Sequence, residues 1–252
     1  MQQFDLEQIH NNVEVASQYI QALQSHLPCS LKELMEHAKT HCPQLKTFCE
    51  TKARSFTKKD KGSAGKLVEF YIFGRLPNND SAPDLLLGDV KSTHVKKMGK
   101  GYNAKERLTL TNVGATSDYA NLQHILDFTL EENPRWVKIQ KGILVVLNQP
   151  EEVWSPEEKT LNEEILALFH YDITQVASWM ETIHADYEKI RQCVREKAAT
   201  QKGQTYLHIH PHGSKQSTTR AFGFTNKFVT RLICHYTGRK MIECGRSLYF
   251  TS

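Results

Sequence analysis

The sequence predicts a mixed α/β (α+β) fold, and three observations support this prediction. Residues 5–26 repeat apolar side chains at helical spacing, as an amphipathic helix does. Residues 142–147 (GILVVL) are a run of β-branched and aliphatic residues, which is typical of a buried strand. Along the chain the patterns follow the order helices, strands, helices, strands, which favours a mixed core.

The first quarter of the chain is expected to be helical. After the helix at 5–26, Ser30 is expected to cap a second helix, because Glu33 follows it three residues later as in a capping box. A third helix is expected from about Gly62 to Gly74. The polar run at 77–81 (PNNDS) then predicts a loop.

Strand patterns occupy the middle of the chain. Residues 84–95 predict a short strand with Val90 inside it, and the glycine- and lysine-rich residues 96–102 predict a hairpin turn. Residues 105–112 alternate apolar and polar side chains, as a half-buried strand does.

The last hundred residues predict helices followed by strands. Ser155 and Pro156 are typical of a helix start, and helical patterning continues in two pieces to about Ala198. Strands are expected at 206–211 and 220–224. A closing helix is expected near Thr225, with five of its side chains buried: Phe228, Val229, Leu232, Ile233 and Tyr236.

Composition limits the class of protein without identifying it. The 252 residues carry a formal net charge of +4, which permits a nucleic-acid partner without requiring one. The six cysteines include no Cys-x-x-Cys pair, so we expect free thiols in a reducing compartment. No signal peptide or membrane span is evident, and we therefore expect a cytoplasmic protein with no membrane partner.

The segment 83–91 (PDLLLGDVK) carries the clearest chemical signal. Side chains alternate along a strand, so Asp89 and Lys91 should share one face while Val90 points into the core. Asp84 lies five residues before Asp89, at the strand entrance. Two carboxylates and an ammonium group are therefore expected to converge on one small volume.

These residue types suit phosphodiester hydrolysis with magnesium. Mg²⁺ binds through one or two carboxylates and lowers the pKa of a bound water, and a lysine can orient or deprotonate that water. Glu69, in an otherwise apolar helical stretch, would be a third carboxylate. The alternatives remain open: Asp89 and Lys91 as a surface ion pair, Asp84 as a turn residue, and Glu69 on an exposed helix edge.

Several stretches resemble the family of the MutH mismatch-repair nicking endonuclease and its related GATC-cutting type II restriction enzymes, within the PD-(D/E)xK nucleases. Residues 60–69 (DKGSAGKLVE) are similar to the family's D-K-G-x-x-G-x-L-x-E segment, and Asp84, Asp89 and Lys91 match its D-x(n)-[DE]-x-K motif. The remaining similar stretches are 102–108 (YNAKERL), 154–158 (WSPEE), 206–211 (YLHIHP), and 220–222 (RAF) with 226–228 (NKF).

The resemblance implies one domain over 1–252, built as a mixed sheet flanked by helices in two lobes around a DNA cleft. The N-lobe, about 1–150, would hold the active site, and the C-lobe, about 151–252, would hold DNA-contact elements. It also implies Mg²⁺, double-stranded DNA as partner, catalysis by Glu69, Asp84, Asp89 and Lys91, and metal ligation by the three carboxylates. The candidate DNA contacts are Lys61, Lys96, Lys97, Lys105, Arg107, His210, His212, Arg220 and Lys227.

This sequence also departs from the family pattern. Asp89 stands where the family more often has glutamate, and its spacing from Asp84 is shorter than usual. His210 replaces an arginine expected near DNA, and Gly223 replaces a tyrosine. Because these changes fall where target sequence and methylation would be read, GATC specificity is not carried over.

Four functional readings follow. Residues 102–108 favour a type II restriction enzyme over a mismatch-repair nickase, and a neighbouring DNA methyltransferase would agree with restriction. The chain would cut both strands as a dimer or by two successive nicks. A DNA-binding module with a decayed nuclease site is the alternative from another class. A structural zinc site at His208, His210 and His212 is a weaker reading, because no cysteine or carboxylate stands at ligand spacing.

Overall fold

The computed structural model describes residues 2–52, 63–76, 83–99, 101–148, 161–197, 203–213, 216–245 and 247–251. Lys61, the loop expected at 77–81 and the helix start expected at 155 lie outside these residues. The chain forms two compact units, each built from two segments: Met1–Lys96 with Gly142–Tyr171, and Lys97–Lys141 with Asp172–Ser252. The expected lobe boundary near residue 150 does not coincide with this interleaved division.

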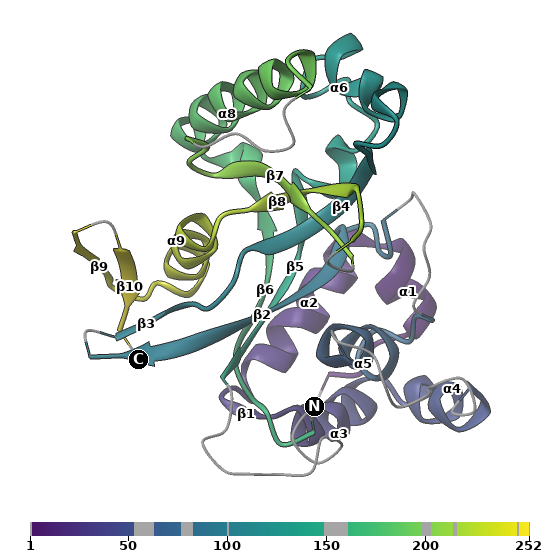
Figure 1. Ribbon diagram of the computed structural model, residues 1–252. Helices are drawn as coiled ribbons and strands as arrows, with labels where there is room; N and C mark the ends of the chain where they lie inside the picture. Colours follow the sequence, from purple (N-terminus) through teal and green to yellow (C-terminus); the bar gives the residue numbers. More distant parts are fainter. Residues whose placement is uncertain are drawn as a thin grey trace. The chain divides into compact units, whose positions relative to one another are not determined.

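Among the described residues, five helices belong to the first unit. They are α1 (Leu6–Asn11), α2 (Val13–Gln24), α3 (Leu31–His41), α4 (Gln44–Lys52) and α5 (Ser63–Tyr71), coloured purple to blue in Figure 1. The single helix expected at 5–26 is wrong, because Asn12 is extended and its side chain accepts hydrogen bonds from the first turn of α2. The capping box at Ser30 and Glu33 is confirmed.

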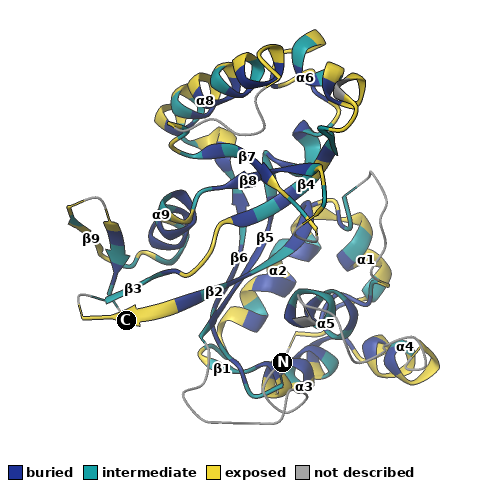
Figure 2. Cartoon of the chain, in the orientation of Figure 1, coloured by how far each residue is buried: buried dark blue, intermediate teal, exposed yellow. Residues whose placement is uncertain are grey.

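Four strands of the first unit pair in the order β1 (Cys29–Ser30), β6 (Glu164–Asp172), β5 (Lys141–Asn148) and β2 (Asp89–Met98). β2 runs parallel to β5, with Asp89 opposite Gly142. β5 is buried from Gly142 to Leu147, as its apolar run predicts. Figure 2 shows β2 passing from a buried start to an exposed end.

The helix expected to continue from 155 is wrong over β6, where the chain is a strand. The residues of β6 alternate between buried and half-buried over most of its length, and β1 and β5 are its neighbours in the sheet. Pairing with β5, and with β1 at Glu164 and Ile165, satisfies backbone groups of the strand and outweighs the helical propensity of its leucine and alanine residues.

The second unit contains two sets of antiparallel strands. One has the order β3 (Gly101–Ala104), β10 (Ser247–Phe250), β9 (Met241–Cys244), and the other has the order β4 (Leu108–Ala115), β8 (Thr219–Phe224), β7 (Leu207–Pro211). Its α-helices are α6 (Gln123–Asp127), α8 (Ala177–Arg195) and α9 (Asn226–Thr237), and short 3-10 turns lie at Tyr119–Leu122, Trp136–Lys138 and Ile173–Gln175.

The closing helix begins where the sequence predicts. Thr225 caps α9 by accepting from the Phe228 backbone N–H, and the four expected aliphatic and phenylalanine side chains are buried. Tyr236 is only half-buried. The six cysteines are free thiols, as expected. Within the described ranges, no helix combines the length and apolar character needed to cross a membrane.

Candidate active site

Asp89 and Lys91 form the centre of the candidate site, at the start of β2. Lys91 Nζ lies 3.0 Å from Asp89 Oδ2, so the two side chains share a face as the alternation predicts. Val90 between them is 2% exposed and belongs to the helical core of the first unit. Asp89 is 3% exposed, and a carboxylate this deeply buried needs charged or hydrogen-bonding partners.

A tight turn brings Asp84 to Asp89. The Leu85 and Gly88 backbones hydrogen bond to each other in both directions, and Gly88 adopts a φ of 109°, which only glycine reaches without strain. The Asp84 N–H then donates to Asp89 Oδ1 at 3.3 Å. The short spacing between the two aspartates thus places them against each other, and both oxygens of Asp89 have partners.

Glu69 on α5 belongs to the same electrostatic cluster. Burial raises the pKa of its carboxyl to about 7, and the negative charges of Asp84 and Asp89 act in the same direction. Lys91 and Lys66 oppose this rise. Glu69 is therefore neither a fully solvated helix-edge residue nor an isolated buried acid.

Close packing of α5 on β2 accounts for this proximity. A Cβ atom added to Gly65 would lie 3.1 Å from Ser92 Oγ, so glycine lets the helix approach the strand. Val68 and Phe70, on either side of Glu69, are completely buried. The helix is therefore held against the unit while Glu69 stays partly accessible. Lys66 lies one turn before Glu69, and it was not singled out from the sequence although it stands in the 60–69 segment.

The donor chemistry of this cluster fits magnesium. Its carboxylate oxygens are hard ligands, and a divalent cation would relieve the repulsion from Asp84 and Asp89 that adds to the effect of burial on the Glu69 pKa. Among the described side chains, no three or more from His, Cys, Asp and Glu are arranged to enclose a metal ion. Mg²⁺ needs only one or two protein carboxylates, since water and substrate phosphate complete its shell. Asp84 and Asp89, with Glu69 when ionised, are the residues that would hold it.

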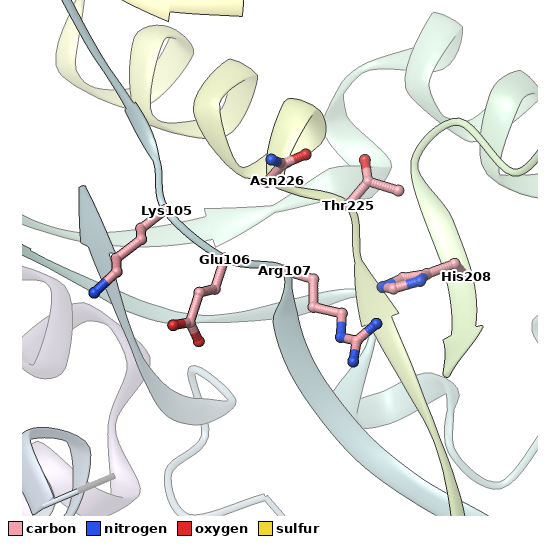
Figure 3. Close-up of a pocket in the computed structure, with 6 residues that line it drawn as sticks. All are labelled: Lys105, Glu106, Arg107, His208, Thr225 and Asn226. Carbon is pink, nitrogen blue, oxygen red and sulfur yellow. The ribbon is translucent and has the colours of Figure 1, made fainter. Parts of the chain in front are cut away.

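A separate polar pocket of about 490 Å³ lies within the second unit. Figure 3 shows its lining: residues from the β3–β4 connection, from β7 and from the start of α9. The lining residues are Lys105, Glu106, Arg107, His208, Thr225 and Asn226. The expected DNA contacts Lys105 and Arg107 are exposed here, and Lys96 and Lys97 are exposed at the end of β2.

The histidines of β7 are placed differently from the expectation. His210 is 2% exposed, stacks on His208 and lies 3.1 Å from Thr109 Oγ1. Burial lowers the pKa of His208 to about 4 and that of His210 to about 3, and neighbouring positive groups add to both effects. Both rings are therefore neutral near pH 7 and offer no charge to a phosphate. His212 is half-exposed just after the strand.

Arg220 and Lys227 are also less exposed than residues that contact DNA would be. Arg220 is 7% exposed, and its guanidinium donates to the backbone carbonyls of Thr218 and Thr219, so this contact stabilises the start of β8. Lys227, in the first turn of α9, is half-buried. Of the nine expected DNA contacts, the described ones that are exposed are Lys96, Lys97, Lys105 and Arg107.

Comparisons with known proteins give no family for this chain. A scan against protein-family models finds no match. A search of curated proteins also finds no significant match.

Proposed function

We propose that this chain is a magnesium-dependent endonuclease that hydrolyses phosphodiester bonds in double-stranded DNA. The observation that supports it best is the arrangement around Asp89. Its carboxylate pairs with Lys91 and accepts from the Asp84 backbone, while Glu69 shares the same electrostatic field. A buried acid paired with a lysine, together with two further acids that interact electrostatically, suits a reaction in which negative charge builds on phosphorus oxygens.

Each residue has a distinct role in this proposal. Bound Mg²⁺ would supply an activated water and neutralise charge on the phosphate. Asp84 and Asp89 would be its permanent ligands, whereas Glu69 would ligate only when ionised, which its pKa of about 7 allows near neutral pH. Lys91 would hold the attacking water or accept its proton through Nζ.

The pocket of the second unit supports a phosphate-rich partner. Lys105 and Arg107 both line it, and Arg107 extends toward His208 in Figure 3. Lysine and arginine contacts to phosphate position a duplex without reading its sequence. The resemblance at 102–108 lies in the same segment and favours the restriction branch, in which both DNA strands are cut.

Plasmid cleavage tests the proposal. Supercoiled DNA of mixed sequence should be cut with Mg²⁺ or Mn²⁺ and left intact with EDTA. Lys91→Ala should lose cleavage at least about a hundredfold, because a general base or water-orienting group contributes that much, while DNA binding stays near wild type. Lys32→Ala, an exposed lysine of α3 in the same unit, is the matched control.

The outcomes separate the alternatives. Binding without cleavage under either metal would contradict the nuclease and favour a DNA-binding module. Unchanged cleavage by Lys91→Ala would contradict the residue assignment. Accumulation of linear product would support the restriction branch, whereas open-circle product alone would support a nickase.

A further inference from the structure

The carboxyl end of α5 is held by side chains that come from α1 and α2. The last carbonyl groups of a helix have no partner within the helix, so they accept from elsewhere. Just beyond α5, the Tyr19 hydroxyl donates to the Ile72 carbonyl at 2.7 Å, and His10 Nε2 lies 2.6 Å from the Phe73 carbonyl oxygen. These contacts span 53 and 63 residues of sequence, so they depend on tertiary packing.

Glycine packing reinforces the same junction. Gly74 has a φ of 59°, and a Cβ atom there would lie 2.9 Å from a methyl carbon of Leu6. A larger residue would therefore be strained and would push α1 away. The next residue, Arg75, donates its N–H to the Glu69 carbonyl at 3.0 Å. The chain that α1 and α2 hold is thus bonded directly to the Glu69 backbone.

The chemistry of both contacts is well defined. A carbonyl oxygen only accepts, so His10 must carry its hydrogen on Nε2. Burial is the main cause that lowers the His10 pKa, nearby Arg75 adds to it, and the bond to Phe73 opposes it. Protonation at the other ring nitrogen keeps this donor. Tyr19 is completely buried, so its hydroxyl has no water to replace the Ile72 carbonyl.

From this geometry we infer that Tyr19 and His10 are positioning residues that set the place of the Glu69 carboxyl within the candidate site. They act through the end of α5 and not through contact with substrate or metal. The catalytic part of this inference rests on the proposed nuclease function, but the structural part does not.

The carboxyl of Glu69 should respond strongly to small movements of α5. It interacts electrostatically with Asp84, Asp89 and Lys91, and such interactions depend strongly on distance in a site that excludes water. In a catalytic site, a displacement of about 1 Å can reduce the rate by about a hundredfold. Loosening the end of α5 should therefore reduce the rate of cleavage without removing any acid.

Hydrogen exchange at the Arg75 amide tests the structural part of this inference directly, because that N–H donates to the Glu69 carbonyl. NMR of ¹⁵N-labelled protein measures the exchange rate. Tyr19→Phe removes only the hydroxyl, and we expect the Arg75 amide to exchange about tenfold faster than in wild type. Cleavage should fall about tenfold in kcat with little change in KM, because the catalytic group and not substrate binding is displaced.

Controls distinguish positioning from general loss of stability. Gln24→Met removes a side-chain bond from the same helix α2 to a different carbonyl, that of Leu168 at 2.6 Å, and it should leave hydrogen exchange at Arg75 unchanged. His10→Ala should act like Tyr19→Phe and serves where Tyr19→Phe does not fold. His10→Gln, whose amide still donates, should restore the wild-type exchange rate and kcat.

Unchanged hydrogen exchange at Arg75 in folded Tyr19→Phe and His10→Ala would overturn the inference. Faster exchange at Arg75 in these variants, when the wild-type protein cuts no DNA with either metal, would support the positioning and contradict the nuclease proposal. The two failures are therefore distinguishable.

Discussion

The four proposed site residues differ in how far the sequence alone could predict their placement. Strand alternation alone predicts that Asp89 and Lys91 share a face, and their ion pair agrees. Asp84 approaches Asp89 because the chain turns at Gly88. In the sequence, a glycine before a strand suggests such a turn without determining it. Glu69 depends on how α5 packs on β2, which no local pattern contains. The apolar stretch around Glu69 left it either a third carboxylate or an exposed helix-edge residue, and the resemblance favoured the first.

Glu69→Gln should stabilise the fold at high pH while it abolishes cleavage. Because the folded state raises the Glu69 pKa to about 7, it binds more protons than the unfolded state between about pH 4.5 and 7. Wild-type stability should then fall as pH rises through this window, and the loss persists above it. Glutamine removes this titration. We expect Glu69→Gln to be more stable than wild type by about 1–2 kcal/mol at pH 8, after allowance for the partial exposure of Glu69.

Urea unfolding of both proteins at pH 5 and pH 8 measures the effect. The gain at pH 8 should largely disappear at pH 5, where the wild-type carboxyl is protonated. An equal difference at both pH values would mean that ionisation of Glu69 is not its cause.

Gly88→Ala should separate Asp84 from Asp89. Alanine at a φ of 109° is strained, and we expect a loss of about 1–3 kcal/mol in stability together with a large loss of cleavage. Gly99→Ala is the control, because a Cβ atom there meets nothing within 4 Å. Unfolding and cleavage are measured for both variants, and equal behaviour would show that the turn does not need glycine.

Among the elements, those with strong local signals were predicted and those determined by pairing were not. The capping box at Ser30 and the cap at Thr225 involve neighbours three residues apart, so sequence suffices. β6 is apolar enough to suit either a helix or a strand, and its sheet neighbours decide. The hairpin of β9 and β10 went unpredicted, since its short, partly exposed strands carry little apolar pattern.

Asp186 shows how one buried acid joins two elements. It lies on α8, is completely buried, and accepts backbone hydrogen bonds from Thr205, Tyr206 and Leu207 at the start of β7. Lys189 Nζ lies 3.6 Å away and supplies the opposite charge. The Asp186 carboxylate therefore accepts from the backbone N–H groups of Thr205 and Tyr206, which precede β7, and of Leu207, the first residue of β7.

Asp186→Ala should destabilise the fold by at least about 3 kcal/mol, because it removes the acceptor of the buried Leu207 N–H and of the partly buried Thr205 and Tyr206 N–H groups. Glu188→Ala, two residues along the same helix, is the control: the Glu188 side chain is 59% exposed, and its Oε1 lies 2.8 Å from Arg191 Nη1. That variant should lose less than about 1 kcal/mol. Chemical denaturation of the two proteins measures both values, and similar losses would contradict the role of Asp186.

At the scale of the whole molecule, the sequence predicts a mixed α/β fold but not its division into units. The chain passes between the two units at 96/97, 141/142 and 171/172. Pairing of β2 with β5 brings together residues about fifty positions apart, and parallel strands always need such a crossover. Hydrophobic periodicity describes only neighbouring residues and gives no boundary between units. The boundary near 150 was implied by the resemblance, and the interleaved segments differ from it.

DNA binding should depend on salt through the pocket of the second unit. The logarithm of the DNA affinity falls linearly with the logarithm of the salt concentration. Each phosphate neutralised by lysine or arginine makes this slope steeper by about 0.9. Lys105→Ala and Arg107→Ala should each reduce the slope by about that amount, and the double variant by about twice as much. Lys240→Ala, an exposed lysine of the same unit outside this pocket, should leave the slope unchanged.

The measurement is fluorescence anisotropy of a labelled duplex between 50 and 200 mM salt, a range over which such contacts change affinity strongly. EDTA prevents cleavage during the titration. The slope should not change between pH 6 and pH 8 through His208 or His210, because their pKa values of about 4 and 3 keep both rings neutral. Unaltered slopes in Lys105→Ala and Arg107→Ala would show that DNA does not bind at this pocket. This conclusion would not depend on the reaction proposed at Asp89.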